Sequence, residues 1–316
     1  MSEAQTPLGP RTFTERLGAA AVFVFLAADR RLRPLWRAVL FVPVMLLLAF
    51  PVLYLLQVAA GGAATTWPLE WRVLLQRSGL LLALLAATYL LLRFLDRRSF
   101  RNVGLGFYQG WGRELGLGVG LGVGLQAVVV AVLVLAGLVD YGVMRTGALG
   151  ALQGLGWYFI VLLPASAMEE VLFRGYPFQR LVESWGKLGA ILLLAALFGW
   201  GHVNNPSATP LSTANVVLAG VLLAALYLRT RGLWLPIGFH VAWNWSMAYV
   251  FSLPVSGLVL SEQLFEVEVS GPEWLSGGNF GPEGSIVGTV ALGAAVVWTA
   301  RTRRLQVSPA LAKEVE

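Results

Sequence analysis

Long apolar stretches alternate with short polar connections along almost the whole chain. A helix needs about 20 predominantly apolar residues to cross a bilayer, and eight stretches approach or exceed that length. They are residues 38–58, 78–94, 115–138, 150–172, 188–204, 213–228, 232–251 and 285–300. The pattern predicts an all-α fold, a polytopic membrane helix bundle with about eight transmembrane helices.

Both ends of the chain are predicted to lie outside the membrane. Residues 18–28 form a shorter apolar run without a convincing small-residue cleavage site, which favours an interfacial helix over a signal peptide. We expect a cytoplasmic amino-terminal segment at 1–35, a transmembrane domain at 36–305 and a cytoplasmic tail at 306–316. No internal repeat is apparent, which counts against repeat-built transporter architectures.

Composition agrees with the bilayer as the main solvent. The 316 residues are 57% hydrophobic and only 13% charged, whereas soluble domains carry about 25% charged residues. The chain has no cysteine, which excludes disulfides, thiolate metal sites and a cysteine nucleophile. The net charge of +6 is spread over short basic runs. Because no continuous basic face is formed, we exclude a nucleic-acid partner.

The basic runs predict the orientation of the protein. With a cytoplasmic amino terminus, 17 basic residues fall in inner segments and only Arg72, Arg77 and Arg145 fall in outer ones. The long connection at 252–284 is then an outer loop with five acidic residues and no basic residue. Lysine and arginine concentrate on the cytoplasmic side, so we expect a multi-pass protein of a bacterial-type inner membrane with both termini in the cytoplasm.

Glycine occupies every second position from Gly116 to Gly124 inside the third stretch. The spacing of Gly116, Gly120 and Gly124 predicts a small helix face on which another backbone packs closely. A dinucleotide-binding turn is excluded because no strand precedes the run.

Three apolar stretches contain charged or polar side chains, which are costly in a membrane and are therefore candidates for function. Residues four apart share a helix face, so Glu170 is expected to pair with Arg174. By the same rule His240 and Asn244 point at one spot. Glu169 lies about 100° around the helix from Glu170, so it is free to face a cavity as a general base. The remaining candidate, His202, follows Phe198 by four residues.

An activated water is the most economical chemistry for Glu169, His202, His240 and Asn244, because no Ser, Thr or Cys nucleophile is linked to them by spacing. Either the glutamate and a histidine polarise the water directly, or Glu169, His202 and His240 hold a zinc ion that does so. Asn244 can then donate its amide to a developing oxyanion. The chain lacks the HExxH helix of the usual zinc proteases.

These residues form motifs that resemble a known family. Residues 169–174 read EExxxR, 198–202 read FxxxH and 240–244 read HxxxN, and residues 234–239 before His240 are similar as well. In this order, in a polytopic chain, they resemble the CPBP family of intramembrane proteases (CAAX protease and bacteriocin-processing, also called Abi), typified by the type II CAAX prenyl endopeptidase. The resemblance covers about residues 150–250.

The resemblance implies an endopeptidase that hydrolyses a peptide bond in a membrane-associated protein or peptide. It implies that Glu169 and His202 activate the water, that His240 and Asn244 stabilise the oxyanion, and that members are often labelled metalloproteases. Glu170 and Arg174 would give structural support. Phe173, Phe198 and Trp243 are candidate substrate contacts, with core packing as the alternative interpretation. The expected partners are membrane lipid and the substrate, and recognition of a lipidated substrate stays open.

Two other functions remain compatible with the same residues. A non-catalytic membrane scaffold or a bacteriocin-immunity-type protein would use the cavity for binding alone. A proton-coupled transporter would use the intramembrane glutamate and histidine as a proton relay. Each motif also has a structural interpretation, as an ion pair at a helix end, an interfacial histidine or a hydrogen bond between helices. Their occurrence together, in order and at these spacings, favours a catalytic site.

Overall fold

The computed structural model describes residues 24–27, 31–59 and 67–313. Most of the predicted interfacial helix at 18–28 lies outside these residues. Each of the eight predicted apolar stretches overlaps a helix. These helices are α2 (Pro34–Ala59), α3 (Leu69–Leu90), α4 (Trp111–Leu135), α5 (Ala148–Arg174), α6 (Tyr176–Trp200), α7 (Pro210–Thr230), α8 (Trp234–Trp245) and α10 (Ile286–Arg301).

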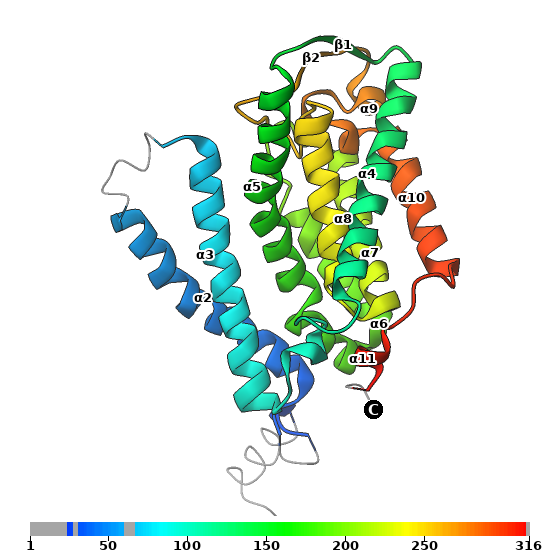
Figure 1. The fold of residues 1–316 in the computed structure, drawn as a ribbon. Coiled ribbons are helices and arrows are strands. Elements are labelled where there is room, and N and C mark those ends of the chain that lie inside the picture. The colour runs from blue at the N-terminus through cyan, green and yellow to red at the C-terminus, as the bar shows by residue number, and fades with distance from the viewer. Residues whose placement is uncertain (1–23, 28–30, 60–66, 314–316) are drawn as a thin grey trace, which may run out of the picture.

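The helices from α4 onward form one bundle, and α2 and α3 stand to one side of it (Figure 1). Within the bundle α8 packs on α4 and α5, and α7 packs on α6 and α10. The pair on the side is attached through α3 against α5 and α2 against α6. The short helix α11 (Pro309–Ala312) lies at one end of the bundle, and a two-stranded sheet lies at the other.

The described residues contain five stretches that are long and apolar enough to cross a membrane. Ala148–Trp200 is one of them and contains both α5 and α6. Two helices fall short of the length, because α8 has 12 residues before a π-helical turn at Ser246–Val250 and α10 has 16 residues. The structure thus confirms a membrane helix bundle. Five stretches of the described residues are long and apolar enough to cross a membrane, so the predicted number of eight is not confirmed.

Helix α3 begins nine residues before the predicted start of its span, at Leu69. Charged side chains made this part look like a loop, but the structure gives two of them polar surroundings. Glu70 accepts hydrogen bonds from the backbone N and the hydroxyl of Ser261, and Arg77 lines a cavity described below. Arg72 and Arg77 are therefore residues of α3 and not of a connection before it, which corrects the predicted start of this helix.

Helix α6 also begins earlier than predicted, at Tyr176, and it changes direction at Gly186. The φ of Gly186 is 77°, a value that glycine adopts without the steric cost of a side chain. The first part of the helix carries Arg180, whose fully buried guanidinium lies 3.5 Å from Asp96. Because α6 ends at Trp200, His202 lies in the turn beyond the helix and not inside a span.

Helices α4 and α8 touch through their backbones. A Cβ atom on Gly118 would lie 2.3 Å from the carbonyl oxygen of Leu235, and one on Gly122 would lie 2.4 Å from that of Phe239. Close packing through glycine was predicted for this helix, but for the wrong face, since a Cβ on Gly120 or Gly124 would meet no atom within 4 Å among the residues that the structure describes. Only one of the two glycine faces is covered by a neighbouring helix.

The connection predicted as an outer loop is partly folded against the bundle. Its strand β2 (Phe265–Val269) pairs antiparallel with β1 (Val139–Met144), and its helix α9 spans Glu273–Ser276. The strands were not predicted, because both are short and lie between apolar stretches. At the end of the connection, the amide of Asn215 on α7 donates to the carbonyl of Glu283 at 2.8 Å. This contact anchors the connection to α7.

Candidate active site

Two adjacent glutamates of α5 reach the same histidine of α8. The Nδ1 of His240 lies 2.7 Å from Oε1 of Glu170, and its Nε2 lies 3.8 Å from Oε2 of Glu169. The side chain of Glu170 is fully buried, whereas that of Glu169 is 21% exposed. The prediction that neighbouring positions give the two carboxylates different environments is confirmed, and both environments include His240.

Arg174 contacts the same carboxylate oxygen of Glu170 as His240 does, and the EExxxR spacing predicted this pair. The guanidinium lies 3.1 Å from Oε1 of Glu170 and donates to the carbonyl of Gly220 at 3.0 Å. It also lies over the ring of Phe198, 4.7 Å from the ring centroid. A buried charge without a partner is strongly destabilising, so this ion pair allows a carboxylate to stand against His240 inside the bundle.

His202 is fixed by the turn that ends α6. Its Nδ1 lies 2.7 Å from the carbonyl oxygen of Phe198. A carbonyl oxygen only accepts, so Nδ1 carries a proton, and in a ring with a single proton Nε2 is left as an acceptor. The ring of Phe198 packs against both imidazoles, at centroid distances of 4.8 Å to His202 and 6.0 Å to His240. The FxxxH motif therefore brings its histidine toward the one on α8.

A single cavity of about 280 Å³ is lined by all four predicted catalytic residues, Glu169, His202, His240 and Asn244. They come from α5, the turn after α6, and α8. His240 and Asn244 are one helical turn apart and both face this space, as their spacing predicted. The Nδ2 of Asn244 lies 3.5 Å from the hydroxyl of Ser166, which is a long hydrogen bond. This contact therefore holds the amide only weakly. The cavity combines a partly exposed carboxylate, two imidazoles and an amide.

The three candidate substrate contacts divide into two groups. Phe198 and Trp243 line the cavity. Phe173 is not among the lining residues that the structure describes; its ring packs edge-on against Phe198 at a centroid distance of 5.2 Å. Phe173 is therefore a core-packing residue in this structure, as the alternative to a substrate contact had it.

Sequence reasoning missed two charged residues of the cavity, Glu283 and Arg77. Glu283 is 8% exposed and accepts hydrogen bonds from the backbone N and the hydroxyl of Ser256, both at 2.5 Å. Its neighbours in sequence are those of an ordinary loop, so no signal identified it. Arg77 would have been found by the rule that identified Glu169, had the start of α3 been predicted at Leu69.

The predicted zinc ligands do not fit a metal centre in this arrangement. Within the described ranges, no group of three His, Asp or Glu side chains comes close enough to hold a metal ion. The Nδ1 of His240 is engaged by Glu170, and its Nε2 is 3.8 Å from Glu169. We therefore derive no catalytic step through zinc.

The fold and the cavity define a class of protein, a multi-pass membrane protein whose helix bundle encloses a cavity with a carboxylate, two imidazoles and an amide. The family comparison narrows this class. Residues 151–246 match the family described as "Type II CAAX prenyl endopeptidase Rce1-like", and this range contains the EExxxR, FxxxH and HxxxN motifs. The match confirms the predicted resemblance to CAAX proteases over this range and supports an intramembrane protease kind of function. No curated protein and no solved structure matches the chain.

Proposed function

We propose that this protein is an intramembrane endopeptidase that hydrolyses a peptide bond of a membrane-associated protein or peptide. The observation that carries the proposal is the position of His240, with one ring nitrogen on Glu170 and the other toward Glu169, in a cavity shared with His202 and Asn244. The family match to an endopeptidase over residues 151–246 supports the same reaction.

The two histidines are suited to different roles because their Nδ1 partners differ. Nδ1 of His240 faces the carboxylate of Glu170, and a ring that also carries a proton on Nε2 can donate a second hydrogen bond from there. Nδ1 of His202 donates to a carbonyl, so a ring with this one proton accepts a hydrogen bond at Nε2. We therefore assign His202 to the water and His240 to the substrate carbonyl.

In the proposed reaction, Glu169 and His202 bind a water in the cavity, and Glu169 takes its proton as the oxygen attacks the scissile carbonyl. The new C–O bond turns the carbonyl oxygen into an oxyanion, which accepts hydrogen bonds from His240 Nε2 and the amide of Asn244. Collapse of the oxyanion breaks the C–N bond, and Glu169 returns its proton to the leaving amine. Such preorganised donors typically contribute about 3–4 kcal/mol of transition-state stabilisation each.

The substrate class follows from where the cavity lies. Its walls come from helices of the membrane bundle, so a scissile bond must be presented at the membrane, which favours a substrate held there by a lipid group or a helix. The name of the matching family adds a specific candidate, a prenylated CAAX-type carboxyl terminus. Pairs of peptides that differ only in the prenyl group test whether this group is recognised.

The experiment compares the purified protein with its Glu169→Gln variant in lipid vesicles, using a quenched fluorescent CAAX peptide with and without the prenyl group. Removing a general base typically costs about 100- to 10,000-fold in rate, and we expect at least the lower value. Glu268→Gln serves as the control, since Glu268 is an exposed carboxylate of β2 and does not line the cavity.

Undiminished cleavage by folded Glu169→Gln would refute the proposed role of this residue. Binding of the peptide without cleavage by the unmodified protein would favour a scaffold or immunity protein. Exhaustive chelation tests the zinc alternative separately. We expect the chelated protein to keep its full activity. Activity that is lost on chelation and restored by zinc alone would establish a metalloprotease.

A further inference from the structure

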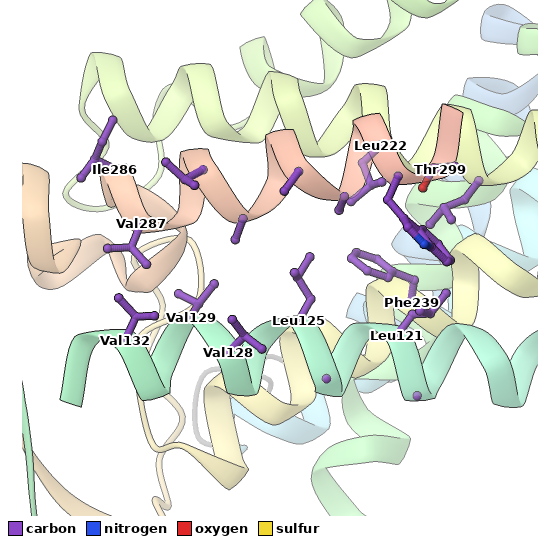
Figure 2. A pocket seen from close by; sticks show the side chains of 18 residues that line it. Leu121, Leu125, Val128, Val129, Val132, Leu222, Phe239, Ile286, Val287 and Thr299 are labelled. Carbon is purple, nitrogen blue, oxygen red and sulfur yellow. The ribbon is translucent and has the colours of Figure 1, made fainter. Parts of the chain in front are cut away.

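A second and larger cavity lies between α4 and α10 and shares Phe239 of α8 with the catalytic cavity. It is a groove of about 750 Å³ with α4 along one side and α10 along the other, and side chains of α7 and α8 close its base (Figure 2). Its described lining consists of glycine and hydrocarbon side chains, except for Trp298 and Thr299 at one end. This composition excludes a polar ligand along most of its length.

Two glycines widen the groove on its α4 side. Gly120 and Gly124 stand among leucine and valine side chains of its lining, and a Cβ on either would meet no atom of the described residues within 4 Å. The groove opens to the outside of the bundle, since Val128 and Val290 on its two walls are 57% and 68% exposed. In a membrane protein the medium on that side is lipid, so acyl chains have direct access to the groove.

Positive charge gathers at the end marked by Trp298 and Thr299. The guanidinium of Arg229 donates to the carbonyls of Thr299 and Ala300 at the carboxyl end of α10. These acceptors are neutral, so the contacts leave the charge of Arg229 in place. Arg301, Arg303 and Arg304 follow directly and are exposed, and Leu305 is 4% exposed and packs into the core. The buried leucine keeps this arginine-rich segment beside the groove.

We propose that the groove binds one acyl chain of an anionic phospholipid, whose phosphate contacts the arginines at the end of α10. From Val287 to Thr299 the groove follows about 12 residues of helix, or about 18 Å at 1.5 Å per residue. One leaflet contributes about 15 Å of hydrocarbon. An acyl chain along the groove therefore places its phosphate at the level of Arg301, where arginine next to an anionic headgroup is favoured.

The bound lipid would touch a wall of the candidate active site. Phe239 lines the groove and also the catalytic cavity, and it precedes His240 on α8. The binding proposal does not depend on catalysis, because its test measures lipid occupancy and not cleavage.

The test uses Trp298 as the reporter. The full-length protein is reconstituted in phosphatidylcholine vesicles with a minor fraction of phosphatidylglycerol, and one of the two lipids carries bromine at mid-chain as a quencher. The fluorescence of Trp298 is obtained as the difference between the unmodified protein and Trp298→Phe. We expect stronger quenching by brominated phosphatidylglycerol than by an equal fraction of brominated phosphatidylcholine, with a preference of about fivefold for each arginine that contacts the phosphate.

Two variants separate the two parts of the proposed site. Gly124→Leu should fill the groove and abolish the excess quenching, whereas Gly116→Leu should leave it unchanged, because Gly116 is equally unobstructed but does not line the groove. A combined change of Arg301, Arg303 and Arg304 to Gln should remove most of the preference for phosphatidylglycerol while chain occupancy persists, with Arg229 as the remaining charge. Equal quenching by both lipids in the unmodified protein would overturn the proposal, and so would a preference that survives Gly124→Leu.

Discussion

The indole N–H of Trp243 donates a hydrogen bond to Oε2 of Glu283 at 3.2 Å, and this contact joins the connection before α10 to the helix that carries His240. Glu283 binds the backbone N and hydroxyl of Ser256 through its other oxygen. One buried carboxylate thus fixes both ends of the connection that covers the cavity.

Replacing Glu283 with Ala should destabilise the protein. The change leaves the indole of Trp243 and the backbone N of Ser256 without their acceptor, and a lost hydrogen bond to a buried charged group costs about 1.5–3 kcal/mol. We therefore expect a clearly lower unfolding temperature in detergent. Glu266→Ala is the control, because Glu266 is an exposed residue of the same connection whose nearest cation, Arg145, is 4.0 Å away. Equal unfolding temperatures for the two variants would contradict this role of Glu283.

Replacing Arg174 with Met should lower the free energy of unfolding more than replacing an exposed arginine of a similar ion pair does. Removing one partner of a buried ion pair costs about 3–5 kcal/mol, because Glu170 would be left charged in the core. Arg98 also lies 3.0 Å from a glutamate, but that pair is more than one-third exposed, and Arg98→Met should cost less than about 1 kcal/mol. Thermal unfolding of the two variants makes the comparison.

The double variant Glu170→Gln/Arg174→Met tests the cause of that loss. If the isolated charge is responsible, the double variant should be more stable than Arg174→Met alone. A double variant that is the least stable of all would show that packing of the guanidinium against Phe198 and Gly220 dominates instead.

The sequence predicted the helix bundle and the catalytic candidates because both depend on local spacing. Apolar length gives the helices, and residues four apart give the Glu170–Arg174 contact. The prediction from sequence failed where the partner of a charged residue lies far away along the chain. Arg180 and Asp96 lie 84 positions apart in sequence, and their contact places a buried charge of the polar first part of α6 beside an opposite charge. Glu283 was missed for the same reason, since its partners come from other segments.

The glycine pattern shows a further limit. Alternating glycines indicate close packing of α4, but periodicity alone does not tell which face meets a neighbour. Gly118 and Gly122 meet α8, whereas Gly120 and Gly124 leave a groove open. Only the position of α8 distinguishes the two faces.

Gly118→Ala and Gly116→Ala should therefore have opposite effects. A methyl group on Gly118 would lie 2.3 Å from a carbonyl oxygen of α8, so the two helices must separate, and overpacking of this kind costs about 1–3 kcal/mol. A methyl group on Gly116 meets open space and replaces the flexible residue by a better helix former, which gains up to about 1 kcal/mol. Unfolding temperatures that fall for both variants would contradict the assignment of the packed face.

The orientation of the protein in the membrane can be tested without background, because the chain contains no cysteine. The β1–β2 sheet and α11 lie at opposite ends of the bundle (Figure 1), and Glu268 on β2 and Lys313 after α11 are both exposed. We expect a membrane-impermeant maleimide to label Glu268→Cys in intact spheroplasts of the expression host and to label Lys313→Cys only after permeabilisation. The physical reason is the retention of the arginine-rich segments, including residues 301–304, on the cytoplasmic side. Labelling of Lys313→Cys in intact spheroplasts, with Glu268→Cys protected, would reverse the orientation and place the carboxyl terminus outside.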